Sequence, residues 1–172
     1  MLSAEEIFAA NEEADREGRI VFGVGSVLRG DDAAGPLLVK KMEDAPIGGW
    51  SAIDGGQTPE NDLGLLRRLA PKHLLLVDAA AMGLEPGAIR RLRAADVASQ
   101  SFITTHALPI TYLLSELESI CQEVTFLGIQ PSGTGFFDPV HARVLAAVDA
   151  IHQCIAQGGD FEGIPYVNDE RS

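Results

Sequence analysis

The segment His73-Leu74-Leu75-Leu76-Val77-Asp78 includes the most apolar of the strands that we predict for this chain. A short, unbroken apolar run bounded by polar residues is typical of a strand buried on both faces of a sheet. The acid at its end is costly in such a place unless it is paired or bound to a cation. This segment therefore predicts a buried sheet and a candidate site at one edge of it.

Strand and helix patterns alternate on both sides of this segment. Further strands are expected at residues 20–24, 51–53, 88–92 (an edge strand) and 124–129, with a shorter extended piece within 101–105. Helices are expected from about Pro36 to Asp44, from Thr58 to about Leu69, from Pro109 through the apolar stripe Ile110, Leu113, Leu114, Leu117 and Cys121, and along a last apolar face from Val140 to Ile155. This alternation predicts an α/β fold: a three-layer, mostly parallel, twisted sheet of about five strands with helices on both faces.

The 172 residues fit a single domain that spans 1–172, with no visible repeat or linker. Residues 3–17 are rich in Ala and Glu and predict a peripheral helix, so that 1–18 form an addition in front of the domain proper. Residues 158–172 are Gly-rich and polar, and we expect a flexible tail there.

Composition narrows the class of partner. A net charge of −12 would repel phosphate backbones, so nucleic acid is not expected as a partner. No charged leader with an apolar run and no membrane-spanning apolar segment is visible, and the two cysteines, Cys121 and Cys154, form no Cys-x-x-Cys pair. We expect a cytoplasmic monomer with reduced thiols and no membrane contact.

The loop after the first strand, residues 23–35, admits two interpretations. Gly23-Val24-Gly25 suggests a dinucleotide-binding loop, but that motif needs a third glycine where this chain has Leu28. The acid pair Asp31-Asp32 would also repel a pyrophosphate. An acid before a helix often caps it, but two acids in succession in a Gly-rich loop indicate that one of them faces a ligand.

Asp32, Asp78 and His106 form the candidate site. Ligands of parallel sheets bind beyond the carboxyl ends of the strands, and each of these residues follows a predicted strand or precedes a predicted helix. Two carboxylates and one imidazole suit a borderline divalent ion such as nickel or zinc, with open positions left for chemistry. Turn or cap roles stay open for both acids. The remaining histidines lack this context and are expected to be surface or structural residues: His73, His141 and His152.

Four motifs carry a family resemblance. They are GVGSVLRGDDAAG at 23–35, DGG at 54–56, LVDA at 76–79 and Thr105-His106. Together they resemble the motifs of the nickel–iron hydrogenase maturation endopeptidases, and the resemblance covers about residues 20–156. Residues 53–62, 104–109 and 126–131 are similar to the branch that processes the large subunit of formate-hydrogenlyase-type hydrogenases, the hydrogenase 3 branch.

The resemblance implies a fold, an activity and a role for three residues. The family fold is a twisted sheet flanked by helices, and its members remove a short C-terminal extension from a hydrogenase large-subunit precursor after nickel insertion. The family's nickel-contacting and catalytic positions fall on Asp32, Asp78 and His106. The nickel is carried by the precursor and held there by cysteines, so the protease need keep no metal of its own. The ion, or a carboxylate beside it, would activate water or polarise the scissile carbonyl.

Two departures from the family pattern stand out. The family often has Asn at the position of Ser26, which puts the geometry around the ligands in question more than the ligands themselves. Residues 1–18 have no counterpart in a typical member.

Three other functions compete with this interpretation. A phosphoreceiver domain needs its acid pair at the strand end and a Lys after the strand 126–129, and this chain has neither. A non-catalytic nickel-checkpoint protein would carry the same ligands, so only a cleavage assay separates it. A general aspartic protease needs two carboxylates that share a proton, which leaves His106 unexplained.

Overall fold

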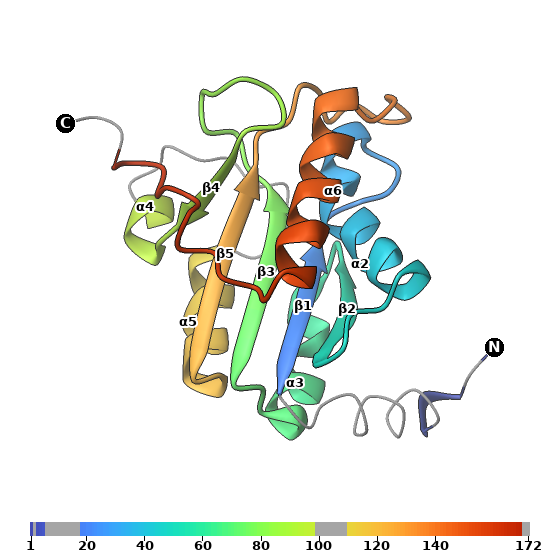
Figure 1. Cartoon of the computed structure of the whole chain (residues 1–172), viewed down its shortest axis with the longest axis vertical. Coiled ribbons are helices and arrows are strands. Elements are labelled where there is room, and N and C mark those ends of the chain that lie inside the picture. The colour runs from blue at the N-terminus through green and yellow to red at the C-terminus, as the bar shows by residue number, and fades with distance from the viewer. Residues whose placement is uncertain (2, 6–17, 99–109, 170–172) are drawn as a thin grey trace.

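The computed structural model describes residues 1, 3–5, 18–98 and 110–169, and within them one five-stranded sheet (Figure 1). The strands are β1 (Arg19–Val24), β2 (Trp50–Gly56), β3 (His73–Ala79), β4 (Ile89–Leu92) and β5 (Glu123–Ile129), in the order β2-β1-β3-β5-β4. Four strands run parallel, and β4 pairs antiparallel with β5 at the edge. The mostly parallel sheet of five strands and the edge position of residues 88–92 are therefore confirmed.

Helices cover both faces of this sheet. The 3₁₀ turn η2 (Gly30–Ala33) leads into α2 (Ala34–Asp44), which packs with α6 (Ala142–Ala156) on one face. The 3₁₀ turn η3 (Pro59–Asp62) leads into α3 (Leu63–Leu69), which shares the other face with α5 (Ile110–Ile120), while the short α4 (Ala94–Ala98) packs against α5 (Figure 1). No helix in the described part of the chain is long and apolar enough to cross a bilayer.

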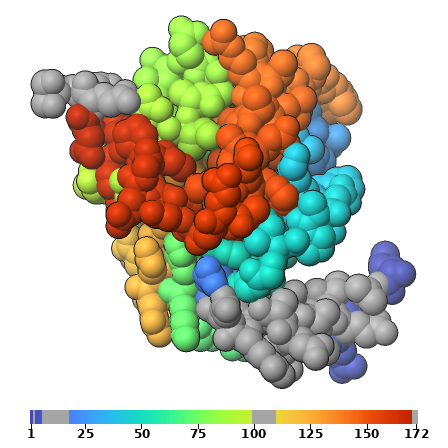
Figure 2. Space-filling model, in the orientation of Figure 1, coloured from blue at the N-terminus to red at the C-terminus, as the bar shows by residue number. Residues whose placement is uncertain are grey.

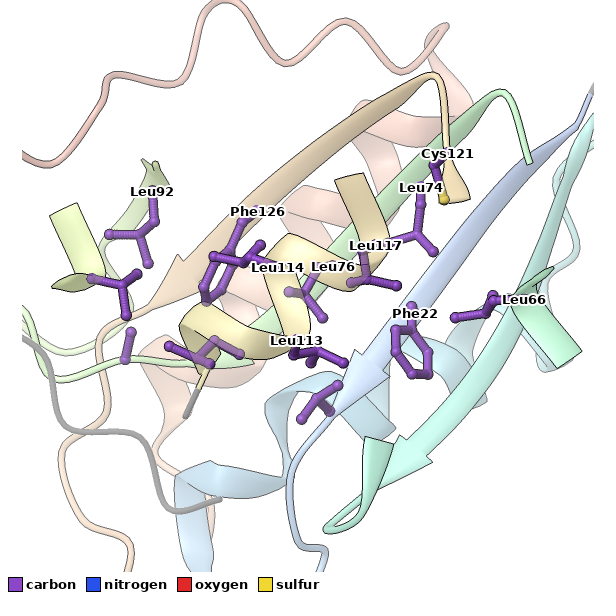
Figure 3. Close-up of a cluster of buried hydrophobic side chains, with 14 of the residues drawn as sticks. Phe22, Leu66, Leu74, Leu76, Leu92, Leu113, Leu114, Leu117, Cys121 and Phe126 are labelled. Atoms are coloured by element: carbon purple, nitrogen blue, oxygen red, sulfur yellow. The ribbon is translucent and has the colours of Figure 1, made fainter. Parts of the chain in front are cut away.

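Two apolar cores result from the two-residue alternation of the central strands. Leu74 and Leu76 of β3 point toward α3 and α5, where they pack with Phe22 and Phe126 (Figure 3). The intervening β3 residues point to the opposite face, where they join residues of α2 and α6. An unbroken apolar strand thus serves both faces at once, which is why its sequence shows no polar alternation.

The bounds of three elements differ between the prediction and the structure. The strand at 73–77 extends to Ala79, so that Asp78 lies inside β3 rather than after it. The strand at 51–53 extends over Trp50–Gly56, because its parallel pairing with β1 continues through Gly56. The helix predicted from Thr58 begins instead as η3. Most of the helix predicted at 3–17, the extended piece at 101–105 and Pro109 lie outside the described residues.

Residues 158–169 do not form the flexible tail that their composition predicts. Phe161 and Val167 are buried, and the Phe161 ring contacts Trp50 and His73. Tyr166 bridges to Arg91 of β4, whose main chain donates to Pro165 and accepts from Val167. Figure 2 shows this segment in red, lying across the molecule from the end of α6. A few apolar side chains therefore anchor a segment whose other residues are Gly-rich and polar.

Candidate active site

The strand order makes the junction between β1 and β3 a topological switch point. The chain passes from β1 to β2 on one side and then crosses to β3 on the other side of β1. At such a switch point the loops that leave the two neighbouring strands diverge, and ligands of open α/β sheets bind there. Asp32, in the loop after β1, and Asp78, near the carboxyl end of β3, come from these two strands.

Glycines allow the loop after β1 to fold back over the strand ends. A Cβ on Gly25 would lie 1.9 Å from the carbonyl oxygen of Asp32, and the φ of Gly25 is +139°, so no other residue fits there without a shift. A Cβ on Gly35 would lie 2.3 Å from the carbonyl oxygen of Val24 and 2.7 Å from that of Val77. The glycines of the 23–35 motif thus bring Asp32 against the ends of β1 and β3.

Asp32 is held by the loop that carries it. The Ser26 amide donates a hydrogen bond to Asp32 Oδ2 at 2.9 Å, and only 2% of Asp32 is exposed. The acid pair predicts that one of its two members faces outward. The Asp32 carboxylate does not, because it lies beneath the surface of the loop. The Ser26 hydroxyl accepts from the Leu28 amide at 3.3 Å. Asn makes the same kind of local turn, so serine replaces the family's usual Asn without changing the donor to Asp32.

Asp31 has a structural role, although not as a helix cap. Its Oδ2 accepts from the amides of Ser132 (2.7 Å) and Gly133 (3.0 Å), and its Oδ1 accepts from the amide of His141 (2.6 Å). The Asp31 amide in turn donates to the Gly133 carbonyl. These donors satisfy the hydrogen-bonding capacity of a carboxylate that is almost fully buried. Asp31 therefore joins the loop after β1 to the loop that leads from β5 to α6.

Asp78 is fully buried within β3. In register it lies opposite Gly128 of β5. Since Leu74 and Leu76 face α3 and α5, the two-residue period points Asp78 to that same face. A carboxylate at this depth requires partners or a cation, which fits a working residue at the sheet edge.

His106 lies outside the described residues, so the structure places two of the three predicted site residues. Among the residues that the structure describes, no group of three or more His, Cys, Asp and Glu side chains is arranged to hold a metal ion. The other histidines have structural contacts, as predicted. His73 Nε2 lies 2.8 Å from Thr125 Oγ1, His141 Nδ1 accepts from the Arg143 amide at the start of α6, and His152 Nε2 lies 2.9 Å from the Ala45 carbonyl.

Two further groups, Gln130 and Asp62, lie at this end of the sheet and were not predicted as site residues. Gln130 accepts from the amides of Met82 (2.6 Å) and Leu84 (3.3 Å), which fixes the loop after β3 against the end of β5. Asp62 lies near Asp54 and Glu60, and burial first, then these two charges, raise the pKa of its carboxyl. The DGG and 126–131 motifs contain Asp54 and Gln130, and they are the signals that point to these groups.

Known proteins match both the sequence and the fold. A family model described as hydrogenase maturation protease matches residues 36–157, which include Asp78 and His106 and begin just after the acid pair. The hydrogenase 3 maturation protease of Escherichia coli K12 is 46% identical over 134 residues, which are 78% of this chain and 86% of that protein.

Solved structures agree with this match. The solution structure of the endopeptidase HycI from Escherichia coli has a TM-score of 0.81 at 39% identity and covers 90% of this chain and 99% of its own. A crystal structure of a hydrogenase 3 maturation protease has a TM-score of 0.82 at 41% identity, with the same coverage. The expected fold and branch are therefore confirmed, and the chain belongs to the hydrogenase maturation protease family, whose members are peptidases.

Proposed function

We propose that this protein is a nickel-dependent endopeptidase that removes the C-terminal extension of a nickel–iron hydrogenase large-subunit precursor once nickel is inserted. The observation that carries the proposal is that Asp32 and Asp78 are buried acids on the two strands that flank the β1–β3 switch point, in a chain of this family. The relatives named hydrogenase 3 maturation protease supply the class of substrate.

Asp32, Asp78 and His106 complete the coordination of a nickel ion that the precursor carries. Two carboxylates and an imidazole are suitable ligands for such an ion. We include His106 because it belongs to the Thr105-His106 motif. The helix α5 begins four residues after His106 and covers the face of the sheet to which Asp78 points. Contacts to a substrate-borne ion hold the precursor in one register, so that a single peptide bond lies beside the carboxylates.

The chain's own residues then act on that bond. Asp32 is positioned to orient or deprotonate a water molecule, because its loop holds one oxygen through the Ser26 amide. Asp78 supplies a second negative charge from the rigid centre of the sheet. This chemistry makes the enzyme an aspartyl-type, metal-gated peptidase.

The reaction takes place in the cytoplasm, where nickel insertion and large-subunit folding precede cleavage. Both cysteines are free, and burial raises the pKa of the Cys121 thiol to about 11, as suits an unreactive thiol in a reducing compartment.

The test is mass spectrometry of the hydrogenase large-subunit precursor from the same organism, with and without inserted nickel. The intact protein should release a short C-terminal peptide only from the nickel-loaded precursor. Asp32→Ala should release none, while the matched variant Asp44→Ala, at the far end of α2, should cleave normally. Equal rates with and without nickel would refute the recognition step. Nickel-dependent binding without cleavage would identify a checkpoint protein instead of a protease.

A further inference from the structure

Four large apolar side chains are exposed beside the acid loop. Val27 and Leu28 in the loop after β1 are 65% and 45% exposed, and Phe136 and Phe137 in the loop before α6 are 57% and 75% exposed. We call these four residues the aromatic patch. Figure 1 shows the two loops next to each other at the carboxyl edge of the sheet, in blue and orange.

Contacts between the loops make the patch a single surface. The Phe137 amide donates to the Leu28 carbonyl at 2.8 Å, and the two phenyl rings meet edge to face with centroids 4.6 Å apart. The Arg29 guanidinium lies over the Phe136 ring, 5.4 Å from its centroid. Beneath the surface, the Asp31 carboxylate joins the same two loops through three amides. The exposed side chains therefore stand on a rigid base.

The backbone of Phe137 is held in an unfavourable conformation. Its φ is +61°, in the left-handed region that side chains other than Gly and Asn rarely adopt. Such strain persists where the surroundings impose it, and it concentrates at functional sites. Here it holds an apolar ring that is 75% exposed and that contacts the ring of Phe136, which is also exposed.

Two residues of the patch belong to the same loop as the candidate active-site residue Asp32. Val27 directly follows Ser26, whose amide donates to Asp32. Any peptide whose scissile bond lies beside Asp32 must therefore run within a few residues of the patch, since an extended chain advances about 3.3 Å per residue. Aromatic and arginine side chains are the groups that dominate binding in protein interfaces.

We propose that the aromatic patch binds apolar side chains of the precursor's C-terminal segment next to the bond that is cut. This inference rests on the proposed function and names the surface that recognises the peptide, as distinct from the residues that contact nickel. The Arg29 guanidinium stands beside the patch, over the Phe136 ring, so the segment that fits is apolar and bears no cation at this point.

The test compares three single variants on the nickel-loaded precursor. Phe137→Asn removes the ring and suits the left-handed backbone, so it should leave the thermal midpoint unchanged or higher, yet raise KM and Kd about tenfold or more with kcat retained. Phe137→Tyr keeps the ring and should retain wild-type binding. Tyr112→Ser removes an aromatic side chain of similar exposure (48%) on α5, outside the patch, and should change neither constant.

Binding and cleavage are measured separately so that the two proposals fail separately. A wild-type protein that binds the precursor without cutting it refutes the endopeptidase, while the Kd values still decide the role of the patch. A wild-type protein that cuts, with a KM that Phe137→Asn leaves unchanged, overturns the patch. A wild-type dimer that Phe137→Asn converts to monomers, with Kd for precursor unchanged, makes the patch a self-association surface and also overturns it. Absence of any binding by the intact protein overturns both.

Discussion

The two ends of the parallel sheet differ in what they bury and what they expose. At the carboxyl end, Asp31, Asp32 and Asp78 are almost fully buried while large apolar side chains stand in solvent. At the amino end, a cavity of about 570 Å³ opens beside the first residues of β3 and β5, lined by groups such as His73, Arg93 and Tyr166. This cavity is therefore remote from the candidate chemistry.

The residues around the cavity make contacts that hold the C-terminal segment in place. Arg91 and Arg93 stack on the Tyr166 ring, at 4.1 Å and 3.4 Å from its centroid, and His73 contacts Thr125 and the ring of Phe161. These groups hold residues 158–169 against the sheet. The cavity thus coincides with a packing seam, whereas the proposed site is chosen from buried acids at a switch point.

The largest effect should come from Asp32→Asn at the carboxyl end. The amide retains an oxygen for the Ser26 donor but loses the charge, so cleavage should fall about a thousandfold while the thermal midpoint changes little. Single-turnover cleavage of nickel-loaded precursor measures the rate. A variant that keeps a tenth of the wild-type rate would remove Asp32 from the active site.

Its neighbour should behave in the opposite way. Asp31→Ala strands three amide donors between two loops, which should lower the free energy of unfolding by about 3 kcal/mol. Urea denaturation followed by circular dichroism gives this value. A loss below about 0.5 kcal/mol would mean that the two loops hold together without the carboxylate.

At the amino end of the sheet, Phe161→Ala should lower the stability of the protein and leave its activity unchanged. The ring is 4% exposed between Trp50 and His73, so its removal should lower the free energy of unfolding by about 3 kcal/mol. The kcat for precursor cleavage at a temperature well below unfolding should stay at the wild-type value. A drop in kcat there would connect the two ends of the sheet.

A smaller effect should appear as pH dependence at the same end. Burial lowers the pKa of His73 from 6.5, the Glu123 charge opposes this shift, and the Arg19 charge adds to it. The unfolded chain then binds a proton that the folded chain resists, so this contribution to stability is present above pH 6.5 and is lost as pH falls below it. Urea midpoints of wild type and His73→Gln should converge on acidification, and parallel curves would contradict the assignment.

The smallest effect is expected for Ser26→Asn, which restores the residue that the family often has. The main-chain donor to Asp32 is unchanged and the side chain can keep its turn to the Leu28 amide. Cleavage rates within twofold of wild type are expected. A larger change would show that the side chain at this position reaches the substrate.

The sequence predicted what depends on local pattern. The strands at 20–24, 73–77 and 124–129 are unbroken apolar runs, and they became the three central strands of the sheet. Asp32 and Asp78 were selected as candidates because an acid in a glycine loop and an acid at the end of a buried strand are both unusual. That their strands, β1 and β3, are neighbours at a switch point follows from strand order, which local pattern does not contain.

What the sequence did not predict depends on distant partners. Asp31 could not be separated from Asp32 as an anchor, since its three amide donors lie about a hundred residues further along the chain. Residues 158–169 looked like a tail because the few apolar side chains among its glycines and polar residues show no periodicity. The aromatic patch was equally invisible, because its members come from two loops that only the fold brings together.

The bridge between Tyr166 and Arg91 also bears on how the protein avoids association with itself. β4 is the outermost strand of the sheet, and an uncovered outer strand is a template for pairing with another chain. The main chain around Tyr166 occupies hydrogen-bonding positions of Arg91 on that side. The C-terminal segment therefore covers part of this edge, and chains that lack the segment would expose a strand that can pair with another chain and aggregate.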